Sequence, residues 1–269
     1  TQRIHRRTKI VATIGPGSES ENLLGRLVRA GVDVFRLNFS HGSAAHHAEA
    51  ARRVRQEAQR AGRYVGILAD LQGPKIRIAG FRDGPVTLES GDSFCLDGRL
   101  GEEDGTVRAV GYGFRELPQY LAPGDTLLLD DGRLRLRVDD VTGPAIDCTV
   151  VLGGRLAARK GINRLGGGIA APALTGKDIA DIRSLDAIQP DFVAVSFVSS
   201  TEDIRLAREL LEERGLAPAV VAKIERAEVV GNDRVLDEIL KASDGIMVAR
   251  GDLGVEVGDA ELIGIQKDL

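Results

Sequence analysis

Residues 220–254 read VVAKIERAEVVGNDRVLDEILKASDGIMVARGDLG, which is two apolar runs separated by a helix-like segment, each run ending in charge. Side chains alternate between the two faces of a strand, so Lys223 and Glu225 are predicted to point to the same side. The same rule places Arg250 and Asp252 on one side of the second run. Two buried strands would thus bring two carboxylates, a lysine and an arginine to their C-terminal ends, where parallel α/β proteins bind ligands.

These charges allow two interpretations. They are either structural ion pairs that cap a barrel core, or a ligand site. A buried lysine–glutamate pair seldom adds much stability, because desolvation offsets the attraction, so two such pairs at neighbouring strand ends favour a site. Two carboxylates near a lysine suit Mg²⁺, which binds one or two carboxylates and leaves positions for substrate oxygens. The chemistry indicated is transfer or stabilisation of an anionic group, with a phosphoryl group as the first choice.

The rest of the chain alternates between β-rich apolar runs and helical spacing, with short connections, and this pattern favours a parallel sheet. Ser18 with Glu21, and Thr175 with Asp178, are spaced as helix-capping pairs. The predicted strands of one parallel set are residues 9–14, 32–38, 64–70, 191–197, 219–225 and 245–250. An eight-stranded barrel needs two more strands, so we expect an α/β fold, a (β/α)8 TIM barrel of which about six βα units are present.

Between Lys75 and Lys160 the pattern changes to short alternating runs separated by Gly, Pro and Asp turns. This pattern predicts an all-β insert, a small barrel. The expected domains are therefore residues 1–73 for the first part of the large barrel, 74–160 for the β insert and 161–269 for the continued barrel. The return linker contains Gly166-Gly167-Gly168. Such a glycine run is more often flexible backbone than a phosphate-binding loop.

Composition excludes several classes of protein. The 269 residues carry 36 basic and 40 acidic side chains, a net charge of −4, so no nucleic-acid-binding surface is indicated. Cys95 and Cys148 fit no metal or redox spacing, and reduced thiols are favoured over a disulfide. The N-terminal TQRIHRRTKI lacks the apolar core of a signal peptide, and no apolar run approaches the about 18 residues of a membrane span. A soluble, cytoplasmic protein without a membrane partner is expected.

Four separated runs resemble the signature of the pyruvate kinase family, in the family's order, and the resemblance extends from about Arg7 to Leu269. The runs are FRLNFSHG at 35–42, DLQGPKIR at 70–77, AKIE at 222–225 and MVARGDLG at 247–254. The resemblance implies Mg²⁺- or Mn²⁺-dependent phosphoryl transfer from phosphoenolpyruvate to ADP, giving pyruvate and ATP in glycolysis. It also implies that the β insert is a mobile lid that excludes water, and that the full-length protein is a homotetramer.

The resemblance also implies residue roles. Glu225 and Asp252 would hold the Mg²⁺, and Lys223 would neutralise the phosphoryl group in flight. Arg36 would contact the substrate phosphate, and the backbone N–H of Gly251 would approach the substrate carboxylate; glycine suits such a close approach. The positions that match the family's nucleotide-binding residues are Asn38, Phe39, Ser40, His41, Arg77 and Lys160.

One departure concerns the monovalent cation. Many members of the family hold K⁺ at the equivalents of Asn38, Ser40, Asp70 and Leu71, with a glutamate where this chain has Lys75. This chain resembles the other subgroup, in which a fixed lysine ammonium supplies the positive charge that K⁺ would bring. We therefore expect catalysis without a K⁺ requirement. The linker at 161–174 also resembles the bacterial, AMP-responsive type.

The family continues beyond the equivalent of Leu269 with two barrel strands and a C-terminal domain, and the threonine associated with protonation of enolpyruvate lies there. We therefore expect this sequence to be a fragment that is inactive alone. Two alternatives remain open: a Mg²⁺-dependent barrel aldolase that handles pyruvate enolate, and a non-catalytic assembly fragment. The nucleotide-binding positions argue against the aldolase, since an aldolase needs no nucleotide.

Overall fold

The computed structural model describes residues 6–269. Residues 1–5, which begin the predicted first barrel segment and the basic N-terminal stretch, lie outside the described residues. The chain divides into two compact units. The first comprises Thr1–Pro74, Pro172–Lys223 and Arg234–Met247, and the second comprises Lys75–Ala171, Ile224–Asp233 and Val248–Leu269.

A six-stranded sheet in the order β1-β2-β3-β12-β13-β14 forms the centre of the first unit, and its last two strands extend into the second. Each neighbouring pair from β1 to β13 is parallel. The sheet confirms the predicted parallel α/β fold. Its strands are β1 (Val11–Thr13), β2 (Val34–Asn38), β3 (Gly66–Asp70), β12 (Phe192–Val195), β13 (Ala219–Ile224) and β14 (Gly245–Val248).

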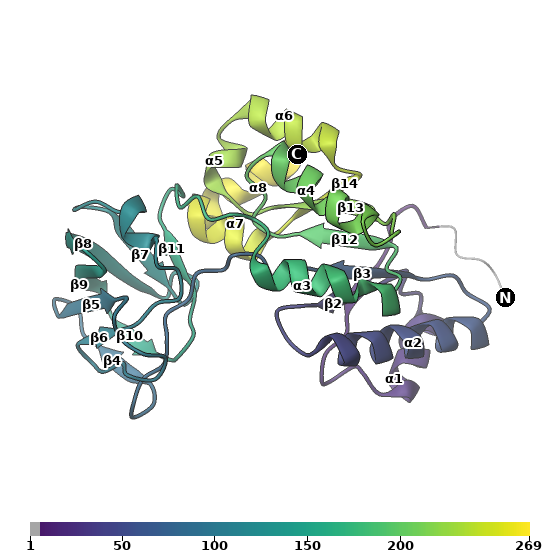
Figure 1. Cartoon of the computed structure of the whole chain (residues 1–269), viewed down its shortest axis with the longest axis horizontal. Coiled ribbons are helices and arrows are strands. Elements are labelled where there is room, and N and C mark those ends of the chain that lie inside the picture. The colour runs from purple at the N-terminus through teal and green to yellow at the C-terminus, as the bar shows by residue number, and fades with distance from the viewer. Residues whose placement is uncertain (1–5) are drawn as a thin grey trace. The chain divides into compact units, whose positions relative to one another are not determined.

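Amphipathic helices alternate with these strands, and Figure 1 shows α2 running alongside β2 and β3. Leu24 and Val28 of α1 and Ala51 and Val54 of α2 are fully buried, because apolar residues at helical spacing form one face. Their burial fixes the helices on the sheet. The helices are α1 (Glu21–Ala30), α2 (Ala44–Arg60), α3 (Gly176–Ser184), α4 (Thr201–Glu212) and α6 (Asp233–Ala242), with a 3₁₀ turn η2 (Leu185–Ala187) after α3.

The two predicted capping pairs had different outcomes. At α3, the Thr175 hydroxyl accepts from Asp178 N at 3.2 Å and the Asp178 carboxylate accepts from Thr175 N at 2.8 Å, as predicted. At α1 the prediction was wrong, because the helix begins at Glu21 after Ser20, which makes no side-chain cap. Ser18 instead accepts from Gly15 N at 3.0 Å, so its hydroxyl serves the turn that follows β1.

The predicted strand at 245–250 was too long. β14 ends at Val248, and α7 (Arg250–Val257) begins two residues later, followed by α8 (Asp259–Asp268). Arg250 and Asp252 therefore lie in the first turn of a helix, where residues two apart face different directions, and the prediction that they share a face was wrong. The alternation rule failed because it holds only while the backbone is extended, and an acidic residue such as Asp252 favours a helix N-terminus.

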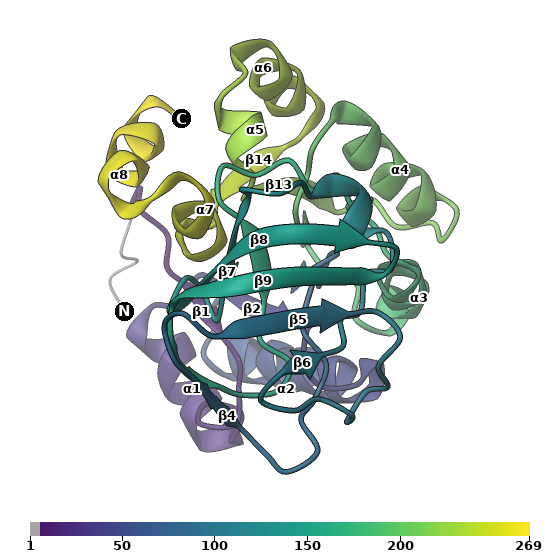
Figure 2. The ribbon, with the colours of Figure 1, turned by 90° about the vertical axis from the view of Figure 1, so that its left-hand side faces the viewer.

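The second unit contains mostly β-structure between Lys75 and Ala171. Its main sheet has the order β11-β7-β8-β9-β5-β6, beside the antiparallel pair β10-β4, and Figure 2 shows β8, β9 and β5 side by side. A 3₁₀ turn η1 (Leu117–Tyr120) and the short helix α5 (Ala227–Val230) complete the unit with α7 and α8. The strands are β4 (Val86–Leu88), β5 (Ser93–Asp97), β6 (Ala109–Val110), β7 (Thr126–Leu129), β8 (Leu134–Thr142), β9 (Ala145–Leu152), β10 (Gly154–Leu156) and β11 (Ile162–Arg164).

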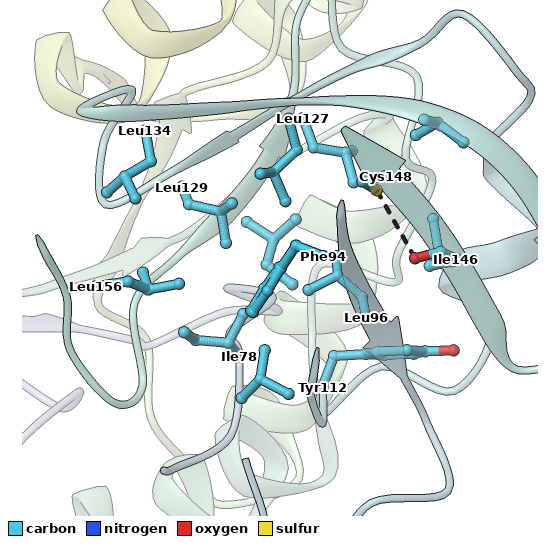
Figure 3. Packing of buried hydrophobic residues seen from close by; sticks show 14 of the residues in the cluster. Ile78, Phe94, Leu96, Tyr112, Leu127, Leu129, Leu134, Ile146, Cys148 and Leu156 are labelled. Atoms are coloured by element: carbon cyan, nitrogen blue, oxygen red, sulfur yellow. Dashed lines mark hydrogen bonds between the residues drawn. The ribbon is translucent and has the colours of Figure 1, made fainter. Parts of the chain in front are cut away.

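Side chains from these strands converge on Phe94, which lies in the middle of an apolar core and is 1% exposed (Figure 3). Tyr112 contributes its ring to the same core while its hydroxyl donates to Pro144 O at 2.7 Å, which satisfies the buried polar tip. Cys148 is buried here and Cys95 is partly buried, and both thiols are free, as expected. Burial raises the pKa of Cys148 to about 12 and is the largest cause that raises the pKa of Cys95 to about 11, so both stay protonated.

Candidate active site

Arg36, in the middle of β2, forms an ion pair with Asp70, the last residue of β3. The Arg36 guanidinium donates through Nε to Asp70 Oδ2 at 2.6 Å, and its NH2 group lies 2.5 Å from the same oxygen. A third donor, NH1, reaches Thr13 Oγ1 on β1 at 3.0 Å. The Asp70 side chain is fully buried, whereas that of Arg36 remains 25% exposed. The arginine is thus fixed along one edge and retains exposed donors for a ligand.

Lys223 brings a second cation to the same carboxylate. It is nearly the last residue of β13 and is 9% exposed. Its Nζ lies 3.3 Å from Asp70 Oδ1 and donates to Ser196 Oγ at 2.8 Å. Asp70 Oδ1 accepts no hydrogen bond, so its contact with Lys223 is a charge–charge contact without hydrogen-bond geometry. One buried carboxylate thus lies between two cations, and both cations can meet an anion at these strand ends.

Ser196 is a member of this cluster that sequence reasoning missed. It directly follows β12, is 1% exposed, and its hydroxyl donates to Leu71 O at 2.7 Å. Its place immediately after a buried strand is the signal that identifies it, because residues at this end of parallel strands line ligand sites. Leu71 donates its backbone N–H to Ala194 O at 3.0 Å, so both its backbone groups are engaged between β3 and β12.

The residues from Asn38 to His41 form a turn after β2. Asn38 Oδ1 accepts from Ser40 N at 3.1 Å, and Asn38 O accepts from His41 N at 3.2 Å. The buried Phe39 ring stacks on His47 with centroids 4.3 Å apart, while the His41 side chain is exposed. The carbonyl of His41 lies 2.8 Å from His47 Nε2. Burial lowers the pKa of His47, so its neutral ring donates to that carbonyl.

In the second unit, Lys75 joins Asp252. Lys75 Nζ donates to Asp252 Oδ1 at 2.8 Å and lies 3.6 Å from Asp131 Oδ1. The sequence did not suggest this contact, and the grouping of Lys75 with Asn38, Ser40, Asp70 and Leu71 stays a prediction. Gly251 precedes Asp252 in the first turn of α7, and a Cβ added to it would meet nothing within 4 Å, so the space beside it is open.

The donor chemistry of Glu225 and Asp252 fits a magnesium ion. Glu225 is 1% exposed and directly follows β13, and Ala249 N donates to Ile224 O at 3.3 Å, which joins the start of α7 to that strand end. Across residues 6–269, no group of three or more His, Cys, Asp or Glu side chains is arranged to hold a metal. Two protein carboxylates are sufficient for Mg²⁺, because this ion keeps several water or substrate oxygens.

The remaining predicted residues, Arg77 and Lys160, lie in two different hollows of the second unit. Arg77 lines a hollow of about 310 Å³ together with Tyr112 and Arg159, and its NH1 donates to Arg159 O at 2.9 Å. Lys160 lines another of about 370 Å³, where its Nζ lies 2.7 Å from Asp130 Oδ1. The side chains of Arg77 and Lys160 are both partly exposed.

The fold and these residues define a class, a parallel α/β barrel protein with a candidate ligand site at its strand ends. Comparison with known proteins gives the family. The family described as "Pyruvate kinase, barrel domain" matches residues 5–269. The chain is 52% identical to a pyruvate kinase of Haemophilus influenzae and 51% identical to pyruvate kinase II of Salmonella typhimurium, in each case over 98% of this chain and 55% of the relative. It is 49% identical to a pyruvate kinase of Buchnera aphidicola.

The chain therefore belongs to the pyruvate kinase family, as its motifs predicted. It spans about half the length of the curated relatives it matches. Within residues 6–269, no helix is both long and apolar enough to cross a membrane.

Proposed function

We propose that the protein containing this chain is a phosphotransferase that moves the phosphoryl group of phosphoenolpyruvate to ADP, giving pyruvate and ATP in glycolysis. Relatives of about 50% identity named pyruvate kinase support this assignment. The structural observation that carries it is the cluster of Arg36, Asp70 and Lys223, which presents two cations on one buried carboxylate. Phosphoryl transfer needs positioning and charge neutralisation more than covalent chemistry by the protein, and such a cluster provides both.

Each residue has a role in this proposal. Lys223 places its ammonium against the phosphoryl group as charge develops in the transition state. Arg36, held along one edge by Asp70, uses its exposed donors to bind the substrate phosphate. Gly251 offers its backbone N–H to the substrate carboxylate, and the open space beside it supports a close approach.

Glu225 and Asp252 would hold the divalent ion, Mg²⁺ or Mn²⁺. The ion would supply positive charge that polarises the phosphoryl oxygens. The contact of Asp252 with the Lys75 ammonium supports this role, because it shows that Asp252 already accepts a cationic partner.

We propose further that Lys75 replaces the monovalent cation, so that catalysis does not require K⁺ at the Asn38, Ser40, Asp70 and Leu71 positions. The lysine supports this idea because its ammonium is held in one place by the hydrogen bond to Asp252 Oδ1. The nucleotide would be bound by Asn38, Phe39, Ser40, His41, Arg77 and Lys160. A cytoplasmic homotetramer, with the β-rich part of the second unit acting as a lid, is proposed from the family resemblance alone.

Calorimetric titration separates the candidate functions. We expect binding of phosphoenolpyruvate that strengthens with Mg²⁺, together with binding of ADP. Binding of oxalate without binding of ADP would support the pyruvate-enolate aldolase instead. Binding of neither substrate would support a non-catalytic assembly role and contradict the proposal. Arg36→Met is the matched variant, and it should weaken phosphoenolpyruvate binding while leaving ADP binding unchanged.

A further inference from the structure

Ser196 connects Lys223 to the backbone of a neighbouring strand. It accepts a hydrogen bond from Lys223 Nζ at 2.8 Å and donates one to Leu71 O at 2.7 Å. The three residues belong to three different strand ends, those of β13, β12 and β3. The serine thus joins a catalytic candidate to a backbone group whose position the parallel sheet fixes.

The direction of these bonds is settled by the number of protons available. A serine hydroxyl has one proton, and this proton points to the carbonyl of Leu71, which can only accept. The lone pairs of the oxygen therefore face the Lys223 ammonium, which can only donate. A hydroxyl oriented in this way fixes one N–H of the Lys223 ammonium along a single line.

The backbone around Ser196 is held in an unusual conformation. Phe197, the next residue, has a φ of 55°, which is uncommon for a bulky side chain. Gly73 packs directly on this turn, since a Cβ added to it would lie 2.6 Å from Ser196 Cβ. Gly73 N in turn donates to Asp178 Oδ1 at 3.0 Å, and Asp178 is fully buried. Strained backbone of this kind persists where the surroundings fix it, and it clusters at functional sites.

We propose that Ser196 is a positioning residue that holds the Lys223 ammonium in place for the phosphoryl group. This inference rests on the proposed function, but the placement of the lysine can be tested without turnover. Asp70 shares the task through its charge–charge contact with the ammonium. Ser196 adds direction, because a hydrogen bond fixes the donor along one line whereas a charge contact does not.

The first test locates Lys223 Nζ in crystal structures of the wild type, Ser196→Ala and Ser196→Cys. When the acceptor is removed in Ser196→Ala, the ammonium should leave the place where it donates to the serine oxygen at 2.8 Å. The displacement should be smaller in Ser196→Cys, whose thiol is a weaker acceptor.

Ser184→Ala is the control, because that hydroxyl donates to the helix carbonyl of Asp181 at 2.7 Å and touches no lysine. Lys223 Nζ should not move in this variant. An Nζ that keeps its place in both Ser196 variants would overturn the proposal. If Ser196→Ala does not fold, Ser196→Cys alone decides the matter.

The second test uses the complete active enzyme and separates this inference from the proposed function. Ser196→Ala should lower kcat about tenfold or more while leaving KM for ADP unchanged, since a positioning residue acts on the transition state. An unchanged kcat would overturn the positioning role even if Lys223→Met abolishes turnover. Full turnover in Lys223→Met would instead contradict the proposed function, whatever Ser196 does to the position of Lys223.

Discussion

Glu256 should make the stability of this protein depend on pH, and Glu256→Gln should remove that dependence. The side chain lies on α7 and is partly buried. Burial is the largest cause that raises the pKa of Glu256 to about 7, and repulsion from Glu228 adds to it. The hydrogen bonds from Ala227 N at 2.8 Å and Asn163 Nδ2 at 3.5 Å, together with the charge of Arg226, lower it only in part.

The size of this change in unfolding free energy follows from the difference between the pKa of Glu256 in the folded protein and in the unfolded chain. The ordinary pKa of a glutamate is 4.5 and that of Glu256 in the folded protein is about 7. The difference of about 2.5 corresponds to about 3 kcal/mol, at 1.36 kcal/mol for each pKa unit. Residual solvent contact reduces this to about 2 kcal/mol. Because the folded pKa is raised, the folded protein keeps its proton between about pH 4.5 and about pH 7 while the unfolded chain loses it. The free energy of unfolding therefore falls across this range and levels off above it.

Urea unfolding at about pH 4.5 and about pH 8 tests this reasoning. Glutamine keeps an oxygen that accepts from Ala227 N but carries no charge, so Glu256→Gln should match the wild type at the lower pH and exceed it by about 2 kcal/mol at the higher pH. Glu261→Gln, on an exposed face of α8, is the control and should show no such difference. If the unfolding free energies of Glu256→Gln and the wild type differed by the same amount at both pH values, the assignment of a buried, protonated carboxyl at Glu256 would be refuted.

Three further predictions concern the metal, the monovalent cation and the glycine linker. Glu225→Gln should weaken Mg²⁺ binding first, with turnover restored by excess Mn²⁺; turnover lost without any change in metal affinity would contradict the metal role. Activity should be equal in K⁺ and in tetramethylammonium because of Lys75, and a strong K⁺ dependence would exclude this substitution. Gly167→Ala should destabilise the second unit by about 1 kcal/mol more than Gly166→Ala, as thermal melts can show. Both glycines have positive φ, but an added Cβ at Gly167 would push the end of the Glu228 side chain out of its hydrogen bond from Gly168 N, whereas that at Gly166 would meet nothing; equal losses would contradict this difference.

Local patterns in the sequence predicted much of the first unit. Apolar runs separated by helical spacing gave the six parallel strands in their observed order, because a buried parallel strand has a distinctive composition. The Thr175–Asp178 capping box was predictable for the same reason, since both partners lie within one helical turn. The start of α7 at Arg250 was not predictable, because a charged segment after a strand has no period that separates a helix from extended chain.

The candidate site was only partly predictable from local patterns. The motifs identified Arg36, Asp70 and Lys223, but not that Asp70 lies between the two cations. The contact of Lys75 with Asp252 joins residues 177 positions apart, and no local pattern specifies such a pair. Ser196 belongs to no motif of its own, and its role depends on the register of β12 beside β3 and β13, which only the folded sheet defines.

The rate of pyruvate formation from phosphoenolpyruvate and ADP in the Lys223→Met variant of the complete enzyme tests the central claim most directly. Methionine has nearly the length of lysine but no charge, so the variant loses the ammonium while the packing of β13 is largely preserved. The account predicts a loss of several orders of magnitude in kcat with Mg²⁺ binding retained, because charge on the transferred group would lose its partner. Turnover near that of the wild type would contradict it.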